Sequence, residues 1–164
     1  MKSRSLFAFL ASIAVAATAP AQTKMSGTLH CAKPDPMHVV EAGDRPGHAF
    51  VVGKVACTWS KPMEVSGIQS KDGGSAFSDE KSGDKSSGDG VHWTGMANGD
   101  KVFVRFQSKT TYDKDGKIAT SGGTWSFTGG TGKMKGIQGK GTDKAKGNPD
   151  GSVTYEVEGE YKLP

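Results

Sequence analysis

The sequence predicts an all-β protein, a small antiparallel β-barrel of about eight strands built mainly from consecutive hairpins. Polar and apolar residues alternate over long stretches, which is the pattern of strands that bury one face. Clusters of glycine, proline, asparagine and aspartate separate these stretches and are typical of turns. Glycine makes up 24 of the 164 residues. Much of it falls inside the alternating stretches, where it permits the coiling of a closed barrel. A β-sandwich is the second choice.

The first 21 residues are expected to be a cleaved signal peptide and not part of the fold. Lys2 and Arg4 give a positively charged start, and the apolar stretch 6–17 is too short to span a bilayer. An A-x-A cleavage signal ends at Ala21. We therefore expect a secreted or periplasmic protein whose single domain covers residues 22–164, with no membrane span.

Eight strands are expected in the mature chain because each stretch alternates and is bounded by turn residues. The stretch 33–47 contains several prolines and glycines and is expected to be a loop. The stretch 71–90, rich in Gly, Ser, Asp and Lys, is expected to be a mobile loop around at most a short strand near 75–78. The expected strands are 24–32, 48–60, 62–70, 91–97, 100–111, 117–128, 133–146 and 152–162.

Cys31 and Cys57 are the only two cysteines, and each lies on the apolar face of its expected strand. Two cysteines in an exported protein usually pair. We expect a disulfide that stabilises the fold by about 3–4 kcal/mol on the chain-entropy model. Two buried free thiols are the alternative.

Two turns predict how the central strands pair. A two-residue turn at Asn98-Gly99 places Trp93 opposite Val104 and Val91 opposite Phe106. A turn at Asp115-Gly116 places Phe106 opposite Trp125 and Val104 opposite Phe127. These side chains are expected to face the interior, with His92, Arg105 and Ser126 on the outer face.

The C-terminal hairpin is expected to fold about Pro149. This register places Gly141 opposite Val157 on the inward face, and Lys140 opposite Glu158 on the outward face. The same alternation places Asp143 on the inward face, opposite Tyr155. Because Asp143 is near the hairpin turn, a position in water at the end of the barrel is favoured over a hydrogen bond to the Tyr155 hydroxyl. If Asp143 were instead buried without a partner, it would have a raised pKa and would be the best candidate for a general acid or base.

The segment Gly129–Gly136, which follows Trp125-Ser126-Phe127, resembles the G-G-T-G-x-[FML]-x-G segment of the allene oxide cyclase and dirigent barrel superfamily. The stretches Asn98–Phe106 and Asp150–Tyr161 are similar to patterns in a group of uncharacterised exported bacterial proteins. The barrel resemblance covers residues 91–162 and implies an eight-stranded antiparallel barrel. No segment matches the substrate-contacting residues of the cyclase, so the resemblance assigns no catalytic residue.

The candidate ligand-binding residues lie in one polar loop and on the inward faces of strands. In the loop 43–48, the polar side chains could line the mouth of the barrel, although the composition favours the alternative that an Asp–Arg contact merely holds a turn. The complete set of candidates is Asp44, Arg45, His48, Trp93, Trp125, Asp143 and Tyr155.

Several functions that need a defined motif are not predicted. His30, His38 and His48 share a segment with Asp35, Glu41 and Asp44, but none of the usual metal-ligand spacings is present, so no metal site is expected. The segment Gly130–Lys133 lacks the spacing and the following helix of a phosphate-binding loop. No nucleophile motif occurs, and we expect neither a cofactor nor catalytic residues.

Charge gives little support for nucleic-acid binding. Removing the signal peptide lowers the formal net charge from +4 to +2, because two of its residues are basic. Five lysines of one expected strand face three glutamates of the next, which neutralise them. These are Lys133, Lys135, Lys140, Lys144 and Lys146, and Glu156, Glu158 and Glu160. We expect no nucleic-acid partner.

Together these observations predict an exported β-barrel that binds a small or apolar ligand. An isomerase similar to allene oxide cyclase is one alternative, and a non-catalytic structural or interaction protein of the envelope is another. The sequence leaves the ligand and the oligomeric state open.

Overall fold

The computed structural model describes residues 22–164, and the expected signal peptide lies outside the described residues. The described chain forms ten strands and one short 3₁₀ helix. In order, they are β1 (Thr23–Cys31), β2 (Met37–Glu41), β3 (His48–Lys61), β4 (Glu64–Val65), β5 (Ile68–Ser82), β6 (Lys85–Met96), β7 (Lys101–Tyr112), β8 (Ile118–Gly130), η1 (Gly132–Met134), β9 (Gln138–Gly147) and β10 (Val153–Lys162).

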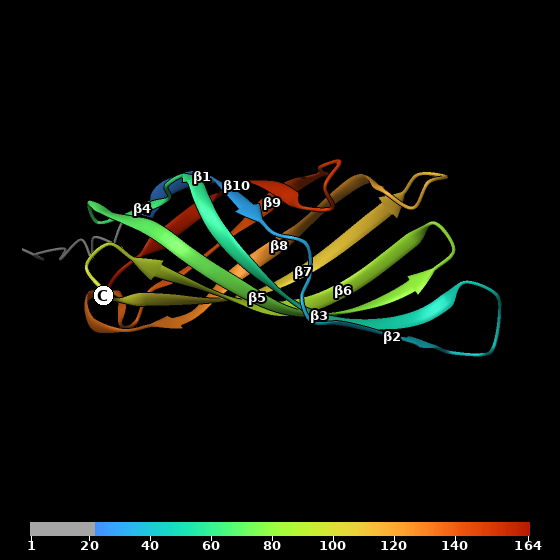
Figure 1. Cartoon of the computed structure of the whole chain (residues 1–164). Helices are drawn as coiled ribbons and strands as arrows, with labels where there is room; N and C mark the ends of the chain where they lie inside the picture. Colours follow the sequence, from blue (N-terminus) through green and yellow to red (C-terminus); the bar gives the residue numbers. More distant parts are fainter. Residues whose placement is uncertain (1–21) are drawn as a thin grey trace, which may run out of the picture.

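Eight of these strands close into an antiparallel barrel, which confirms the predicted fold. The neighbours run β3-β1-β10-β9-β8-β7-β6-β5, and β5 pairs back onto β3 to complete the circle. The strand β2 pairs with the part of β3 that β1 leaves free, and β4 pairs only with β5. Figure 1 shows the hairpins β2–β3, β5–β6 and β7–β8 extending at one end of the barrel, with β4 and the C-terminus at the other.

The prediction of a loop at 71–90 is wrong, because these residues form most of a long hairpin, β5–β6. Gly83 lies in its turn at φ 61°. The stretch is polar on both faces, so it lacks the alternation that marks a half-buried strand. Ser75 and Asp79 nevertheless point inward with Phe77, since the interior is polar at this end of the barrel. In the other expected loop, 33–47, the edge strand β2 is also present.

The predicted register of β6 is wrong by one residue, which reverses its two faces. The turn is a three-residue loop, Ala97-Asn98-Gly99, in which Met96 pairs with Asp100 and Gly99 takes φ 88°. Val104 therefore lies opposite His92 and not opposite Trp93. His92 faces the interior, whereas Trp93 and Val91 lie on the outer face with 42% and 59% of their surface exposed.

The predicted register of the next hairpin is confirmed. Phe106 lies opposite Trp125, and Val104 lies opposite Phe127. The Trp125 and Phe127 rings meet edge to face, with their centroids 5.3 Å apart. These side chains form the middle of the barrel interior.

The C-terminal hairpin keeps its predicted faces but is shifted by two residues. Its loop is Pro149-Asp150-Gly151, with Gly151 at φ 86°, so the centre of the turn is one residue later than expected. Gly141 therefore lies opposite Gly159, and Asp143 lies opposite Val157 and not Tyr155. A shift of two preserves the alternation, so Asp143 still points inward. On the outer face Lys140 lies opposite Glu160, not Glu158.

One end of the barrel is closed by an apolar core. The loops that contain β4 and η1 cover this end with buried methionine, valine and isoleucine side chains. The buried residues there include Met63, Val65, Met96, Val102, Met134, Ile137 and Tyr161. Tyr161 also accepts a hydrogen bond from the backbone N–H of Ser66 at 2.9 Å, which fixes the covering loop to the wall of the barrel.

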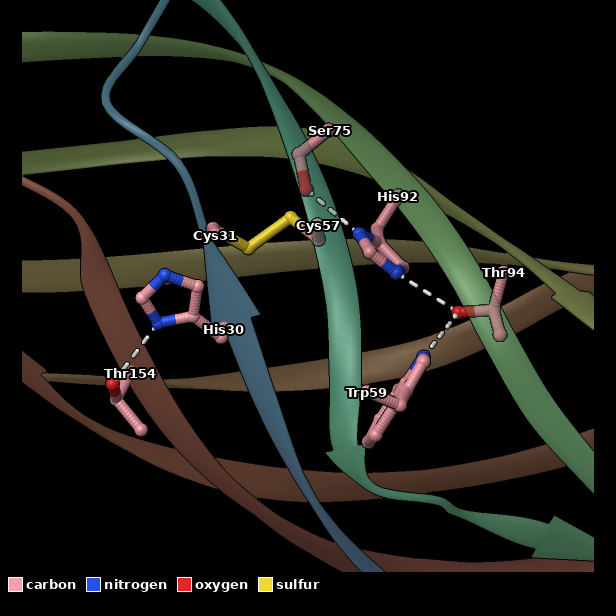
Figure 2. Close-up of a disulfide and its surroundings, with 8 residues drawn as sticks. All are labelled: His30, Cys31, Cys57, Trp59, Ser75, His92, Thr94 and Thr154. Carbon is pink, nitrogen blue, oxygen red and sulfur yellow. Dashed lines mark hydrogen bonds between the residues drawn. A yellow bond between two sulfur atoms is a disulfide. The ribbon is translucent and has the colours of Figure 1, made fainter.

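The predicted disulfide is confirmed: Cys31 on β1 is bonded to Cys57 on β3 (Figure 2). The two residues lie directly opposite each other in the sheet, and both are buried. A disulfide is typical of proteins from oxidising compartments. Among residues 22–164, no helix is long and apolar enough to cross a membrane.

Candidate functional site

The interior of the barrel contains a cavity of about 200 Å³. Its walls come from all eight barrel strands, and several inward side chains, among them Phe106, Phe127 and Tyr155, stay half-buried because they border this space. The volume is below the roughly 300 Å³ at which pockets for drug-sized ligands begin. It exceeds the roughly 150 Å³ of a cavity that holds benzene. The lumen therefore fits a small molecule of about one ring.

A chain of hydrogen bonds lies deep in the lumen (Figure 2). His92 Nδ1 is 2.8 Å from the Ser75 hydroxyl, and His92 Nε2 is 2.9 Å from the Thr94 hydroxyl. The Trp59 indole N–H donates to the same Thr94 oxygen at 3.4 Å. Burial lowers the pKa of His92 to about 4, so its imidazole is neutral at neutral pH. The wrong register of β6 had placed this histidine outside.

Two carboxylates point into the lumen nearer the end that the apolar core does not close. Asp143 comes from β9 and Asp79 from β5, and both line the cavity. Among residues 22–164, neither has an ion-pair or hydrogen-bond partner. Burial raises the pKa of Asp143 to about 6. Burial, assisted by the charge of Asp89, also raises the pKa of Asp79.

Tyr155 lies within electrostatic reach of both carboxylates. Burial is the main cause that raises its pKa to about 12, and the charges of Asp143 and Asp79 add to it.

Among the predicted site residues, Trp125, Asp143 and Tyr155 line one cavity. Asp79 was missed because it lies in the predicted loop 71–90, whose residues are polar on both faces and show no apolar alternation.

Glycines opposite the carboxylates make room for them. A Cβ atom on Gly88 would lie 1.9 Å from an Asp79 carboxylate oxygen, and one on Gly123 would lie 3.3 Å from an Asp143 carboxylate oxygen. These glycines are the neighbours of Asp79 and Asp143 across the sheet. The sequence thus leaves space where the acids project.

Replacing Asp143 by asparagine tests whether its charge is uncompensated. A carboxyl whose folded-state pKa exceeds its unfolded value of 3.8 destabilises the fold as pH rises through about 6. At pH 8 we expect D143N to be more stable than the wild type, with a free energy of unfolding about 1–2 kcal/mol higher after allowance for partial solvation. Near pH 4 the difference should be small. Urea unfolding at both pH values measures this, and a difference that does not change with pH would contradict it.

The polar loop residues come together outside the lumen. Arg45 Nη1 donates to the Asp44 carboxylate at 2.5 Å, as the predicted turn contact requires. His48 bonds to Asp44 through Nδ1 and to Glu80 on β5 through Nε2, the latter at 2.9 Å. The Asp44 carboxylate raises the pKa of His48, with a further rise from Glu80, and His48 lowers that of Asp44. These residues tie the β2–β3 loop to the β5–β6 hairpin. Their role in ligand binding stays a prediction.

Trp93 does not line the lumen. Its indole lies on the outer face of β6, and the Lys101 ammonium sits 5.2 Å from its ring centroid. Among the described residues, no group of three or more His, Cys, Asp or Glu side chains is arranged to hold a metal ion. His30, from the histidine-rich segment, lies 3.5 Å from the Thr154 hydroxyl on the outer face (Figure 2).

A second hollow of about 1040 Å³ lies on the outer face of β1 and β7–β10. It is broad and open to solvent, and charged and hydroxyl side chains border it. Lys24 and Glu160 form an ion pair of 2.9 Å at its edge. A small ligand there would keep most of its surface in water, so the lumen, which is surrounded by the strands of the barrel, is the stronger candidate site.

The fold and the lumen define a closed, eight-stranded antiparallel β-barrel protein with an internal cavity. Among solved structures, the chain is similar to a dirigent protein described as a pterocarpan synthase, with 14% sequence identity and a TM-score of 0.47. The similarity covers 96% of this chain and 98% of that chain. No protein-family model matches the chain, and no curated protein matches it.

Proposed function

We propose that this protein is an exported binding protein that holds one small ligand with an apolar body inside the barrel. The observation that carries the proposal is the cavity of about 200 Å³ inside the barrel, which the apolar core closes at one end. Six aromatic side chains border it, namely Trp59, Phe77, Phe106, Trp125, Phe127 and Tyr155. A concave, mostly apolar site with a few polar groups is the usual form of a small-molecule site.

Filling the lumen should abolish binding. Val157 borders the cavity on β10, so V157F places a ring in the space that the ligand needs. Val91 is the matched control, because it lies on the outer face with 59% of its surface exposed. Benzyl alcohol serves as a neutral probe of the right size. In a titration followed by NMR, we expect saturable binding to the wild type and V91F, and at least tenfold weaker binding to V157F.

The proposal fails if the wild type shows no saturable shifts for lumen residues, or if V157F binds the probe as well as the wild type does. Native mass spectrometry of protein purified from its own host complements the titration, because a co-purified molecule would identify the natural ligand.

An isomerase remains the second candidate for the same lumen. It needs an inward acid or base, and Asp143, with a pKa of about 6 and near Tyr155, supplies one. In this case D143N would retain ligand binding but lose turnover of a substrate identified through the co-purified molecule.

An interaction role in the envelope is supported by a different observation. Large apolar side chains are exposed on the outer face of β6 and β7 and on the β2–β3 hairpin, and exposed apolar patches often mark contact surfaces. They are Met37, Val39, Val40, Phe50, Val52, Val91, Trp93 and Phe103. This role is compatible with binding in the lumen, because the two surfaces do not overlap.

A further inference from the structure

The charges that border the lumen are all of one sign. Its lining contains Asp79 and Asp143 but, among the described residues, no lysine or arginine. His92 is neutral at neutral pH. Lys81 projects inward beyond Asp79, but its ammonium lies 4.9 Å from the Tyr112 ring centroid and within 4 Å of neither carboxylate. The lumen therefore carries uncompensated negative charge.

Aromatic rings supply a second, independent feature. Trp125 and Phe127 pack edge to face in the middle of the lumen, and Phe106 lies opposite Trp125 on the neighbouring strand. Tyr155 stands within reach of both carboxylates. Aromatic faces attract organic cations through their quadrupoles, and they do so more strongly where water is excluded. The aromatic rings and the carboxylates thus both favour a ligand that carries a positive charge.

We propose that the ligand of the lumen is a small organic cation, an ammonium group attached to an apolar body of about one ring. The ammonium lies toward Asp143, Asp79 and the Tyr155 hydroxyl, and the apolar body lies against Phe106, Trp125 and Phe127. An anion is excluded because it would meet two carboxylates in a medium of low dielectric constant. A neutral ligand leaves both acids unpaired, which costs free energy that a cation recovers. This inference rests on the proposed function, because it needs the lumen to be a binding site.

Three ring compounds of similar size separate the effect of charge from the effect of shape. Benzylamine is a cation at neutral pH, benzyl alcohol is neutral and benzoate is an anion. We expect the mature wild-type protein, titrated by NMR or calorimetry at pH 7.5, to bind benzylamine at least tenfold more tightly than benzyl alcohol. We expect no measurable binding of benzoate.

The variant D79N/D143N removes the charges and keeps the shapes. We expect its affinity for benzylamine to fall to that for benzyl alcohol, while benzyl alcohol binds about as well as before. D89N is the matched control: Asp89 is an acid on the outer face, paired with Arg105 at 2.9 Å, so the preference should persist. If the double variant does not fold, the comparison of the three compounds on the wild type still tests the preference for a cation.

Each outcome of the wild-type series decides one question. Equal affinity for benzylamine and benzyl alcohol, or tighter binding of benzoate, overturns the cation inference but leaves the lumen as a binding site. No binding of any of the three compounds overturns the proposed function, and the cation inference with it.

Discussion

Replacing Gly141 by alanine is expected to destabilise the barrel by about 3 kcal/mol, which lowers the melting temperature by roughly 10 °C. Gly141 lies on the inward face of β9, against the indole of Trp125. A Cβ atom there would lie 2.1 Å from the backbone oxygen of Glu158 and 2.3 Å from Cζ2 of Trp125. Neither neighbour can give way easily. The first is part of the sheet, and the Trp125 indole N–H donates to the Thr142 carbonyl at 3.2 Å.

The matched control is Gly95→Ala on β6. A Cβ atom on Gly95 would meet its nearest atoms at 3.6 Å and 3.8 Å, which are ordinary contact distances. We expect G95A to change the free energy of unfolding by less than about 0.5 kcal/mol. Urea unfolding of the three proteins measures both effects. If G141A were as stable as the wild type, Trp125 could not lie against this strand, and the lumen would have a different shape.

The registers show what turn residues alone can and cannot predict. At Asn98-Gly99 the dipeptide correctly marked a hairpin, but a two-residue and a three-residue loop both accept glycine at a positive φ. The choice between them moves the strand by one residue, so Trp93 and His92 exchanged faces. In the C-terminal hairpin the error was two residues, and Asp143 kept its predicted face. Errors of one residue therefore damage a site prediction far more than errors of two.

Only some residues of the candidate site could be predicted, because the alternation of polar and apolar residues is clear in some strands and absent in others. Trp125, Asp143 and Tyr155 were found because they lie in strands that alternate clearly between polar and apolar residues. Asp79 and His92 were missed because apolar alternation identifies a core, whereas part of this interior is polar. A strand such as β5, with Ser75 and Asp79 facing a lumen and polar residues facing solvent, has no apolar face to detect. A strand that contributes polar residues to a site is therefore hard to recognise from the alternation of polar and apolar residues.

The disulfide lies where the regular pairing between neighbouring strands of the barrel wall is shortest. β1 and β3 pair over only four residue positions, with a bulge after Thr28, whereas most other neighbours pair over nine or more. Beyond Cys31, β1 ends, and β2 takes its place along β3 only from Met37. Between these strands, residues 32–36 keep three backbone hydrogen bonds to Lys54 and Ala56, so the regular strand pairing is short here although the contact with β3 continues. The bond between Cys31 and Cys57 supplies a covalent link at this position.

Removing this link with C31A/C57A should cost about 3–4 kcal/mol, because the unfolded chain regains the entropy of a loop whose ends are 26 residues apart. Alanine is the suitable replacement, since it leaves no unpaired hydroxyl at two buried positions. Urea unfolding measures the loss, and the reduced wild type should reproduce most of it. Amide hydrogen exchange should also accelerate more between β1 and β3 than between Phe106 and Trp125, because local opening is easiest where the regular strand pairing is shortest and the lost disulfide had joined the strands. A loss below about 1 kcal/mol, or equal acceleration in both regions, would show that the pairing of β1 with β3 holds without the disulfide.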